Sequence, residues 1–447
     1  MTSVIADCVP TTVLQVSEYH GWGLTSMTSV SALTRGALLT ALAAVPLAAQ
    51  TSPTTSAIPQ EARRVHDATI VLDTHFDTPA NLGRPGWSIM DRHSRAESGD
   101  QVDYPRMVEG GIDGGFFAIF TAQGLRTPEG DRDARDAGLV RAVQIREMVA
   151  RHPDAFRLVT TAAEARAAVA AKKRFVFISM ENGYPFEGDL SLVRTFQRLG
   201  VTMMSPVHFK TNDLADSATD KPEWNGLSPK GKAFVAEANR LGILIDCSHA
   251  SDDVLRQTIA QSRAPIILSH SGVRAIFDHP RNVTDADLRA LAAKGGVVQI
   301  NAFDGYMIAQ PKIPAREAAL AELAAKQPPR ATMTEADRKA YLSARKAIDA
   351  RWPVPRATFD DVMKHLLHAI EVAGIDHVGI SGDFDGGGGV EGFDDITAFP
   401  KITAALLARG YGAADVAKVW GGNALRVLDA AQAAADPGMR PTIPITS

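Results

Sequence analysis

Short apolar runs recur along the chain and alternate with longer segments of helical pattern. Eight of the runs are continuously apolar, as expected of strands buried on both faces. They cover residues 69–73, 115–119, 175–179, 201–205, 243–246, 265–268, 297–300 and 378–381. Alternation of strand and helix predicts a parallel sheet, and eight such units predict closure into a (β/α)8 TIM barrel. A doubly wound open sheet is the alternative fold.

Helices are predicted between the strands at 190–199, 229–240, 252–259, 285–293, 359–372 and 414–430. Ser228 stands where a helix N-cap is expected, and Gly242 follows the same segment as a stop signal. Residues 306–356 fit neither element of the repeat. They are rich in Ala, Glu, Lys and Arg, with helical pieces at 315–326 and 334–350. We interpret this segment as a helical insertion after strand seven that lies near the mouth of the barrel and covers it.

The first part of the chain resembles a targeting segment. Arg35 precedes an apolar stretch at 37–49 that ends in small residues. This stretch is shorter than the ~20 residues of a membrane span. We therefore expect a leader and linker at 1–58, with Met27 as the true start, a barrel domain at 59–435 and a tail at 436–447. The mature protein would have no integral membrane span and would be secreted or periplasmic.

Composition narrows the class of protein. The chain has 447 residues, of which 22% are charged, and its net charge is -4. It has no excess of basic residues, so nucleic acid is excluded as a partner. Cys8 and Cys247 are the only cysteines, which excludes a disulfide framework and a thiolate metal site. Cys247 is expected to be a small buried apolar side chain.

Histidines and carboxylates stand at or just beyond the ends of the predicted strands. They are His75, Asp77, Glu181, His208, His249, His270 and Asp383. The carboxyl ends of parallel strands in one barrel point to one mouth, so these side chains are expected to converge there. Their types are those of the ligands in a two-metal hydrolase.

The spacing of these residues suggests individual roles. His75 and Asp77 are two apart on an extended chain, so both face the same way and suit one Zn²⁺. Glu181 has two oxygens and would bridge two cations about 3.5–4 Å apart. His249 and His270 are each flanked by serines, which can fix the tautomer of a ligating imidazole.

Other polar residues are left for the substrate. His208 would stabilise the oxyanion of a tetrahedral intermediate. Asp383 would accept a proton from water and return it to the leaving nitrogen, and Asp385 remains an alternative because it has the same parity. Arg281 would bind a carboxylate in bidentate fashion. His365 and His368 lie on a predicted outer helix, and we expect them to be structural.

Several motifs together resemble one known family. They are His75-Phe76-Asp77, Glu181-Asn182-Gly183, Asp246-Cys247-Ser248-His249, Leu268-Ser269-His270 and Gly382-Asp383-Phe384-Asp385. In this combination and order, over about 65–428, the chain resembles the membrane (renal) dipeptidase family of the amidohydrolase superfamily.

The resemblance implies a metallo-dipeptidase with two Zn²⁺ per chain, other divalent metals remaining open. His75 and Asp77 would hold one ion, His249 and His270 the other, and Glu181 would bridge them. His208 would contact the substrate, Arg281 its carboxylate, and Asp383 would be the catalytic acid and base. The substrate would be a small peptide, including dipeptides with a C-terminal D-residue.

The chain also departs from the family. It lacks the cysteines for a disulfide-linked dimer, so a homodimer stays open, and its last residues carry no hydrophobic anchor signal. The insertion at 306–356 leaves the substrate pocket open. One alternative is therefore a binuclear amidohydrolase of other specificity, for β-lactams or N-acyl amino acids. A more distant one is a non-catalytic metal or solute binder.

Overall fold

The computed structural model describes residues 58–441. The expected leader, the start at Met27 and the last six residues of the tail lie outside this range. Among the described residues, no helix combines the length and the apolar character that crossing a bilayer requires.

Nine strands are found in the described part of the chain, and all of their pairings are parallel. They are β1 (Leu72–Phe76), β2 (Gly114–Phe120), β3 (Phe156–Leu158), β4 (Arg174–Glu181), β5 (Val201–Met204), β6 (Leu244–Ile245), β7 (Ile267–Ser271), β8 (Val297–Ile300) and β9 (Val378–Ile380). One sheet has the order β1-β2-β4-β5-β6, with β3 on β4, and the other has the order β7-β8-β9.

Two single parallel bridges join these sheets into a closed barrel. Asp246 pairs with Ile267, which connects β6 to β7, and Phe76 pairs with Phe384, which connects β1 to the chain after β9. All strands except β3 therefore form a ring of eight, as a (β/α)8 barrel requires. This confirms the predicted fold and excludes the open sheet.

Most of the predicted strand boundaries differ from the structure by one to three residues, and one strand was not predicted. β1 begins at Leu72 and ends at Phe76, so His75 lies inside the strand and not beyond it. β7 likewise includes His270. The short strand β3 was not predicted, because three residues with Arg157 at the centre make no continuous apolar run.

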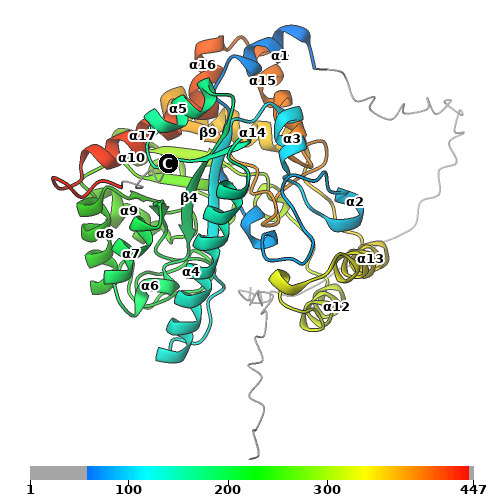
Figure 1. The fold of residues 1–447 in the computed structure, drawn as a ribbon, viewed down its shortest axis with the longest axis horizontal. Coiled ribbons are helices and arrows are strands. Elements are labelled where there is room, and N and C mark those ends of the chain that lie inside the picture. The colour runs from blue at the N-terminus through cyan, green and yellow to red at the C-terminus, as the bar shows by residue number, and fades with distance from the viewer. Residues whose placement is uncertain (1–57, 442–447) are drawn as a thin grey trace, which may run out of the picture.

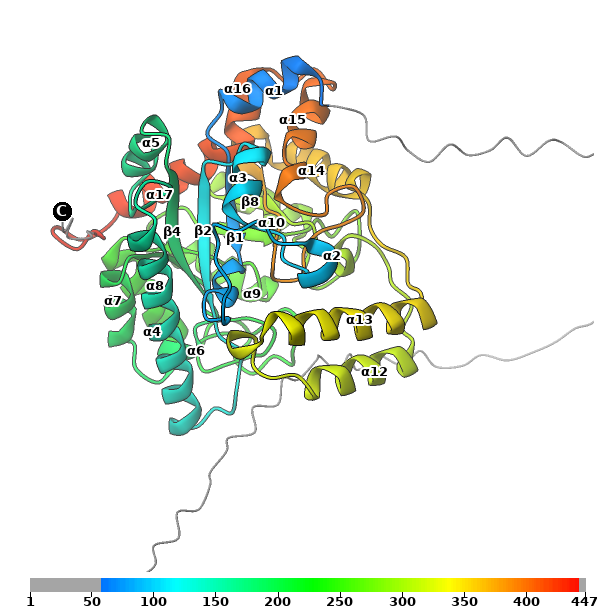
Figure 2. The ribbon, with the colours of Figure 1, turned by 45° about the vertical axis from the view of Figure 1, so that its right-hand side comes forward.

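Helices surround the barrel (Figures 1 and 2). Those before the insertion are α1 (Gln60–Asp67), α2 (Arg95–Ser98), α3 (Tyr104–Gly110), α4 (Pro128–Arg151), α5 (Ala162–Ala170), α6 (Tyr184–Glu187), α7 (Ser191–Arg198), α8 (Pro229–Leu241), α9 (Asp252–Gln261) and α10 (Asp285–Ala293). Those after it are α14 (Phe359–Ala373), α15 (Pro400–Leu407), α16 (Ala413–Ala417) and α17 (Asn423–Ala433). The caps expected for α8 are confirmed, since Ser228 accepts from the Gly231 N–H and Gly242 has φ +71°.

The helix expected at 414–430 is found, but a π-helical turn that was not predicted, η5 (Lys418–Gly422), divides it into α16 and α17. Gly421 in this turn lies so close to β1 that an added Cβ would be 2.5 Å from the Ile70 carbonyl oxygen. The turn thus lets the chain pack against the entry of β1 before α17 continues.

One apolar cluster closes the amino-terminal end of the barrel. It joins Leu72, Phe116 and Phe177 of the strands to Leu425 and Leu428 of α17. Figure 2 shows α5 and α17 at the end where β4 begins, and α6 at the end where β4 finishes. The carboxyl ends of the strands therefore remain available for a site.

The insertion follows β8, which is strand seven of the barrel, and it is helical as predicted. It contains α11 (Asp304–Met307), α12 (Pro314–Ala325), the 3-10 turn η2 (Arg330–Thr332) and α13 (Glu335–Arg351). α12 and α13 lie side by side near α2, at the carboxyl end of the barrel (Figure 2). Arg316 and Asp349 form an ion pair of 2.8 Å between them.

His365 is structural, as expected, and it supports the loop after β7. Its Nδ1 accepts the Val273 N–H at 2.9 Å, so Nε2 carries the proton and faces the Met307 carbonyl oxygen at 3.4 Å. Burial lowers the pKa of His365 from 6.5 to about 4. The ring is therefore neutral in the folded protein over a range where it is protonated in the unfolded chain.

This difference predicts a loss of stability in mild acid. Between pH 6.5 and about 4 the unfolded chain binds a proton that folded His365 does not, so the unfolding free energy falls as the pH falls. The expected contribution is about 2 kcal/mol at pH 4.5. Denaturant unfolding at several pH values should show a shallower fall for His365→Gln, which keeps an acceptor and a donor. Parallel curves for the two proteins would contradict this.

Candidate functional site

All of the predicted site residues meet at the carboxyl end of the barrel. His75 and His270 lie within β1 and β7, and Glu181 is the last residue of β4. The remaining ones follow strands in loops: Asp77, His208, His249, Arg281 and Asp383. Each of the eight is less than 10% exposed. The structure thus converts widely separated sequence positions into one buried polar cluster.

Glu181 stands at the centre of this cluster. Its Oε1 lies 3.0 Å from Nε2 of His249 and 3.4 Å from Nε2 of His270. The same oxygen is 3.5 Å from Nε2 of His208. The other oxygen, Oε2, is 3.5 Å from Nε2 of His75. The two oxygens therefore face different imidazoles, which is the arrangement of a bridging carboxylate.

His75 and Asp77 also meet, although the backbone between them is not fully extended. Asp77 has φ -87° and ψ 6°, so the strand has ended there. Its N–H donates to the Phe384 carbonyl at 3.0 Å, which joins the end of β1 to the loop after β9. The side chains still approach to 3.2 Å between His75 Nε2 and Asp77 Oδ2.

A chain of hydrogen bonds assigns the tautomer of His270. Asp246 accepts from the Ser248 and Ser269 hydroxyls at 2.7 and 2.6 Å. Because the Ser269 proton is used on Asp246, the contact of 2.8 Å between Ser269 Oγ and His270 Nδ1 requires the imidazole to donate. His270 Nε2 then has no proton, and its lone pair faces Glu181.

The donor set fits a metal cation. Nε2 of His249 and Nε2 of His270 are 2.9 Å apart, and Nε2 of His75 is buried without a hydrogen-bond partner. Lone pairs and carboxylate oxygens that face one another repel unless a positive charge lies among them. Neutral imidazoles and carboxylates are ordinary zinc ligands, and the Asp246–Ser269 chain is the outer support that such ligands need.

Three sets of residues in the described chain could hold an ion, each with ligand atoms within 4.8 Å of one another. They are His75, Glu181 and His270; Glu181, His208 and His249; and His75, Asp77 and Asp383. His208, predicted to contact the substrate, and Asp383, predicted to be the catalytic acid and base, thus also lie within reach of a metal ion held by the expected ligands.

The structure distinguishes Asp383 from Asp385. Both side-chain oxygens of Asp385 are engaged elsewhere, by the Thr78 hydroxyl at 2.7 Å and the Gln101 N–H at 2.8 Å. Asp383 instead lies beside Asp77: a Cβ added at Gly386 would be 2.0 Å from Asp77 Oδ2 and 2.7 Å from Asp383 Oδ1. Only glycine fits between these two carboxylates.

Burial raises the pKa of Asp383 to about 8, and the nearby charges of Asp77 and Glu181 act in the same direction, against His75. A carboxyl group with this tendency can hold a proton near neutral pH and release it, as a general acid and base must.

Arg281 is buried and held beside the histidines. Its Nη1 donates to Ser271 Oγ at 2.8 Å and its Nη2 to the His270 carbonyl at 2.7 Å, while Nε has no partner. Burial lowers the pKa of the guanidinium. An exposed surface role is therefore excluded, and the remaining donor can serve an anion.

Two aromatic residues that sequence analysis missed flank His208. Phe120, the last residue of β2, lies with its ring 4.9 Å from that of His208, and the Phe209 ring lies at 4.0 Å. They are 38% and 41% exposed, so they form an apolar edge at the mouth. Burial lowers the pKa of His208, so its ring is neutral beside this edge. In the sequence, the one feature that could have identified Phe120 and Phe209 as site residues was their position at or beyond the end of a strand.

Asp73 is a third residue that the sequence analysis did not assign to the site. Its Oδ1 accepts from the Ser381 hydroxyl at 2.6 Å and its Oδ2 from the Gly382 N–H at 2.7 Å. Burial raises its pKa to about 6. The carboxylate joins β1 to the loop that carries Asp383, and its place inside a strand gave no hint of this.

A closed parallel barrel with histidines and carboxylates at its carboxyl-end mouth defines the class of amidohydrolase-type enzymes. The sequence profile of the membrane dipeptidase family (Peptidase family M19) matches residues 59–440. The chain therefore belongs to the membrane dipeptidase family and is a peptide-bond hydrolase of the metallopeptidase type.

Relatives agree with this assignment. Dipeptidase tcpJ of Claviceps purpurea is 27% identical over 354 residues, which cover 76% of this chain and 72% of that protein. The probable dipeptidase PvdM from Pseudomonas aeruginosa is 31% identical, with a TM-score of 0.72 over 84% of this chain and 98% of its own. A metallo peptidase from Rhodobacter sphaeroides, solved with a phosphinate mimic of the dipeptide L-Ala-D-Ala, is 26% identical, with a TM-score of 0.62 over 81% of this chain and 99% of its own.

Proposed function

We propose that this chain is a binuclear zinc dipeptidase that hydrolyses free dipeptides, including those with a C-terminal D-residue. The observation that carries the proposal is the central position of Glu181, whose two oxygens face different histidines. His75 and Asp77 would hold one ion, His249 and His270 the other, with Glu181 shared. Zinc supplies Lewis acidity, which polarises a carbonyl and makes water nucleophilic near neutral pH.

The residues around the metal ligands would then transfer the proton, stabilise the oxyanion and exclude water. Asp383, whose carboxylate lies beside Asp77 at the edge of the ligand cluster, takes a proton from the attacking water and returns it to the leaving nitrogen. His208, neutral because burial lowers its pKa, donates a hydrogen bond to the oxyanion. Phe120 and Phe209 keep water from that side of the reacting carbonyl.

Arg281 would select short substrates. Its buried guanidinium binds the free C-terminal carboxylate of the substrate, and burial strengthens such a charged hydrogen bond. The carboxylate then lies one residue from the bond that is cut, which limits the substrate to dipeptides. The D-residue is supported by the Rhodobacter sphaeroides relative, which binds a mimic of L-Ala-D-Ala.

A substrate panel tests the function and the role of Arg281 together. We expect the wild-type enzyme to cleave L-Ala-L-Ala and L-Ala-D-Ala far faster than the dipeptide amide, N-acetyl-alanine or a β-lactam. Arg281→Ala should raise KM for dipeptides about 100-fold, the effect of 2–3 kcal/mol from a lost charged hydrogen bond. The dipeptide amide should respond little, because it has no carboxylate.

Arg281→Lys serves as the matched variant, since it keeps the charge and loses the planar fork; it should recover part of the KM. An equal effect of Arg281→Ala on the acid and the amide would exclude the proposed contact. Faster cleavage of N-acetyl-alanine or the β-lactam than of any dipeptide would instead favour an amidohydrolase of the other specificity.

A further inference from the structure

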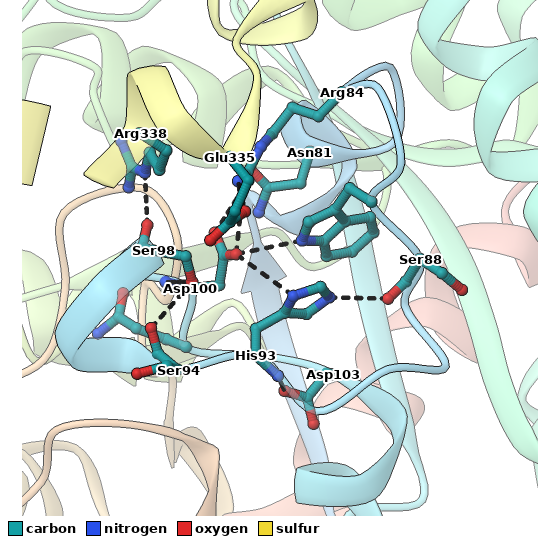
Figure 3. Close-up of polar contacts among 12 residues, drawn as sticks. Asn81, Arg84, Ser88, His93, Ser94, Ser98, Asp100, Asp103, Glu335 and Arg338 are labelled. Carbon is teal, nitrogen blue, oxygen red and sulfur yellow. Dashed lines mark hydrogen bonds and ion pairs between the residues drawn. The ribbon is translucent and has the colours of Figure 1, made fainter. Parts of the chain in front are cut away.

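The insertion after β8 is tied to the mouth of the barrel by charged side chains. Arg84 in the β1–β2 loop donates to Glu335 of α13 at 2.9 Å, and Arg338 of α13 donates to the Ser98 carbonyl at 2.5 Å. Arg84 is itself fixed, because Nη1 contacts both oxygens of buried Asp100 at 2.9 and 3.0 Å. Figure 3 shows these contacts converging between α13 and the loop after β1.

Arg330 in η2 reaches further, to the loops that carry two of the site carboxylates. Its Nε donates to Asn81 Oδ1 at 3.0 Å, and its Nη1 donates to the Asp385 carbonyl at 2.7 Å. Asn81 ends a 3-10 turn, η1 (Thr78–Asn81), that begins directly after Asp77. Asp385 lies two residues after Asp383. One guanidinium thus connects the loop of Asp77 to the loop of Asp383.

The loop after β9 has features that make such a connection necessary. Asp383 and Asp385 have φ values of +50° and +65°, and a non-glycine residue in this region costs about 1 kcal/mol or more. Residues 386–389 are all glycine, so the following chain has little conformational preference. Contacts from outside the loop must therefore select the conformation that places Asp383 beside Asp77.

Most of these contacts come from the barrel itself, but two come from the insertion: Arg330 binds the Asp385 carbonyl, and Arg356 Nη2 donates to the Gly389 carbonyl at 2.7 Å, at the far end of the loop. Gln101 and Thr78 bind the Asp385 side chain, and the Asp385 N–H donates to Gln101 Oε1 at 2.8 Å. Within the part of the chain that the structure describes, Arg330 is the only residue that donates a hydrogen bond to the Asp385 carbonyl, and Arg330 belongs to the insertion. The insertion is therefore part of what holds this loop.

We propose that the insertion is a positioning element for the reaction and that Arg330 is its positioning residue. By bridging Asn81 and the Asp385 carbonyl, Arg330 holds the loop at 382–389 so that the Asp383 carboxylate stays beside Asp77. Arg141 of α4 supports the same turn from elsewhere, through a bond from Nη1 to the Pro79 carbonyl. The effect on turnover rests on the proposed role of Asp383, whereas the effect on the loop does not.

The kinetic test compares Arg330→Ala with Arg316→Ala. Arg316 belongs to the same insertion and pairs with Asp349 without contacting the site loops, so it is the matched control. Arg330→Ala should lower kcat for dipeptides by 10- to 100-fold, on the order expected of a displaced catalytic group, with KM within about twofold. Arg316→Ala should keep both parameters. Low-millimolar guanidinium should restore part of the lost kcat, because Arg330 is partly accessible.

A second readout does not depend on activity. The Gly386 and Gly388 N–H groups both donate to the Asp383 carbonyl, at 3.3 and 2.8 Å. Hydrogen exchange at 382–389 should become at least about tenfold faster in Arg330→Ala and remain unchanged in Arg316→Ala. Faster exchange in an enzyme without dipeptidase activity would support the positioning of the loop and reject the proposed function.

Two results would overturn the inference. One is an Arg330→Ala enzyme with wild-type kcat and wild-type exchange at 382–389. The other is a variant whose exchange rises throughout the barrel while kcat and KM change together and guanidinium restores nothing, because Arg330 would then support the fold in general.

Discussion

Glu181→Gln is expected to remove the metal and to abolish dipeptide hydrolysis. Wild-type protein should hold about two zinc ions per chain, and the variant should lose at least one of them, with kcat lowered by ~1000-fold or more. The physical reason is the geometry of the carboxylate, whose Oε1 faces three imidazoles while Oε2 faces His75. A glutamine is neutral, and its NH₂ group cannot bind a cation.

Metal analysis beside the kinetic assay checks this prediction. Chelation of the wild-type protein should eliminate activity and added zinc should restore it, whereas zinc should not restore Glu181→Gln. Glu187→Gln is a suitable control, because Glu187 is also buried, with its pKa raised by burial to about 7, yet it contacts the Asp213 N–H and not the histidines. A metal-free wild-type enzyme with full activity would end the proposal.

Asp383→Asn is expected to lower kcat by about 100- to 10,000-fold, the range of general acid–base catalysis. KM should change little, because the proton transfer is needed in the transition state and not for binding. Asparagine has the shape of aspartate and can still occupy the space beside Asp77, so the loss should not reflect a collapsed site. Steady-state kinetics on L-Ala-L-Ala measure both parameters.

The thermal stability of metal-free Asp383→Asn shows whether the substitution damages the fold. Burial raises the pKa of Asp383 to about 8, above its value of 3.8 in an unfolded chain, so the folded protein holds a proton that the unfolded chain loses. This group therefore reduces stability as the pH rises from about 4 to 8. Metal-free Asp383→Asn should have a higher Tm than metal-free wild type at pH 8. A lower Tm together with lost activity would indicate damage to the fold and not a missing proton carrier.

The barrel and the set of site residues were predictable because both depend on local patterns. Apolar runs on both faces identify strands of a parallel sheet, and residues at their carboxyl ends must then share one mouth. His75, Glu181 and His270 were found in this way, even though the strand boundaries were shifted by a few residues. The insertion was also predicted, since its helical composition interrupts the repeat.

Other features depend on contacts that no local pattern contains. Asp246 and Ser269 set the His270 tautomer through hydrogen bonds between β6 and β7. Arg281 is buried because its guanidinium packs against β7, where the Ser271 hydroxyl and the His270 carbonyl accept hydrogen bonds from its two Nη atoms. The choice between Asp383 and Asp385 depends on Gln101, which is nearly three hundred residues away in sequence.

The sequence alone therefore determined the repeat of strands and helices, the ligand types and their common end of the barrel, since each follows from residue type and periodicity. The tertiary structure decided which oxygen faces which imidazole, which aspartate lies beside Asp77 and where the insertion docks. These are consequences of closing the ring through Asp246–Ile267 and Phe76–Phe384, because only closure brings the first and last strands, and the side chains they carry, within a hydrogen bond of one another.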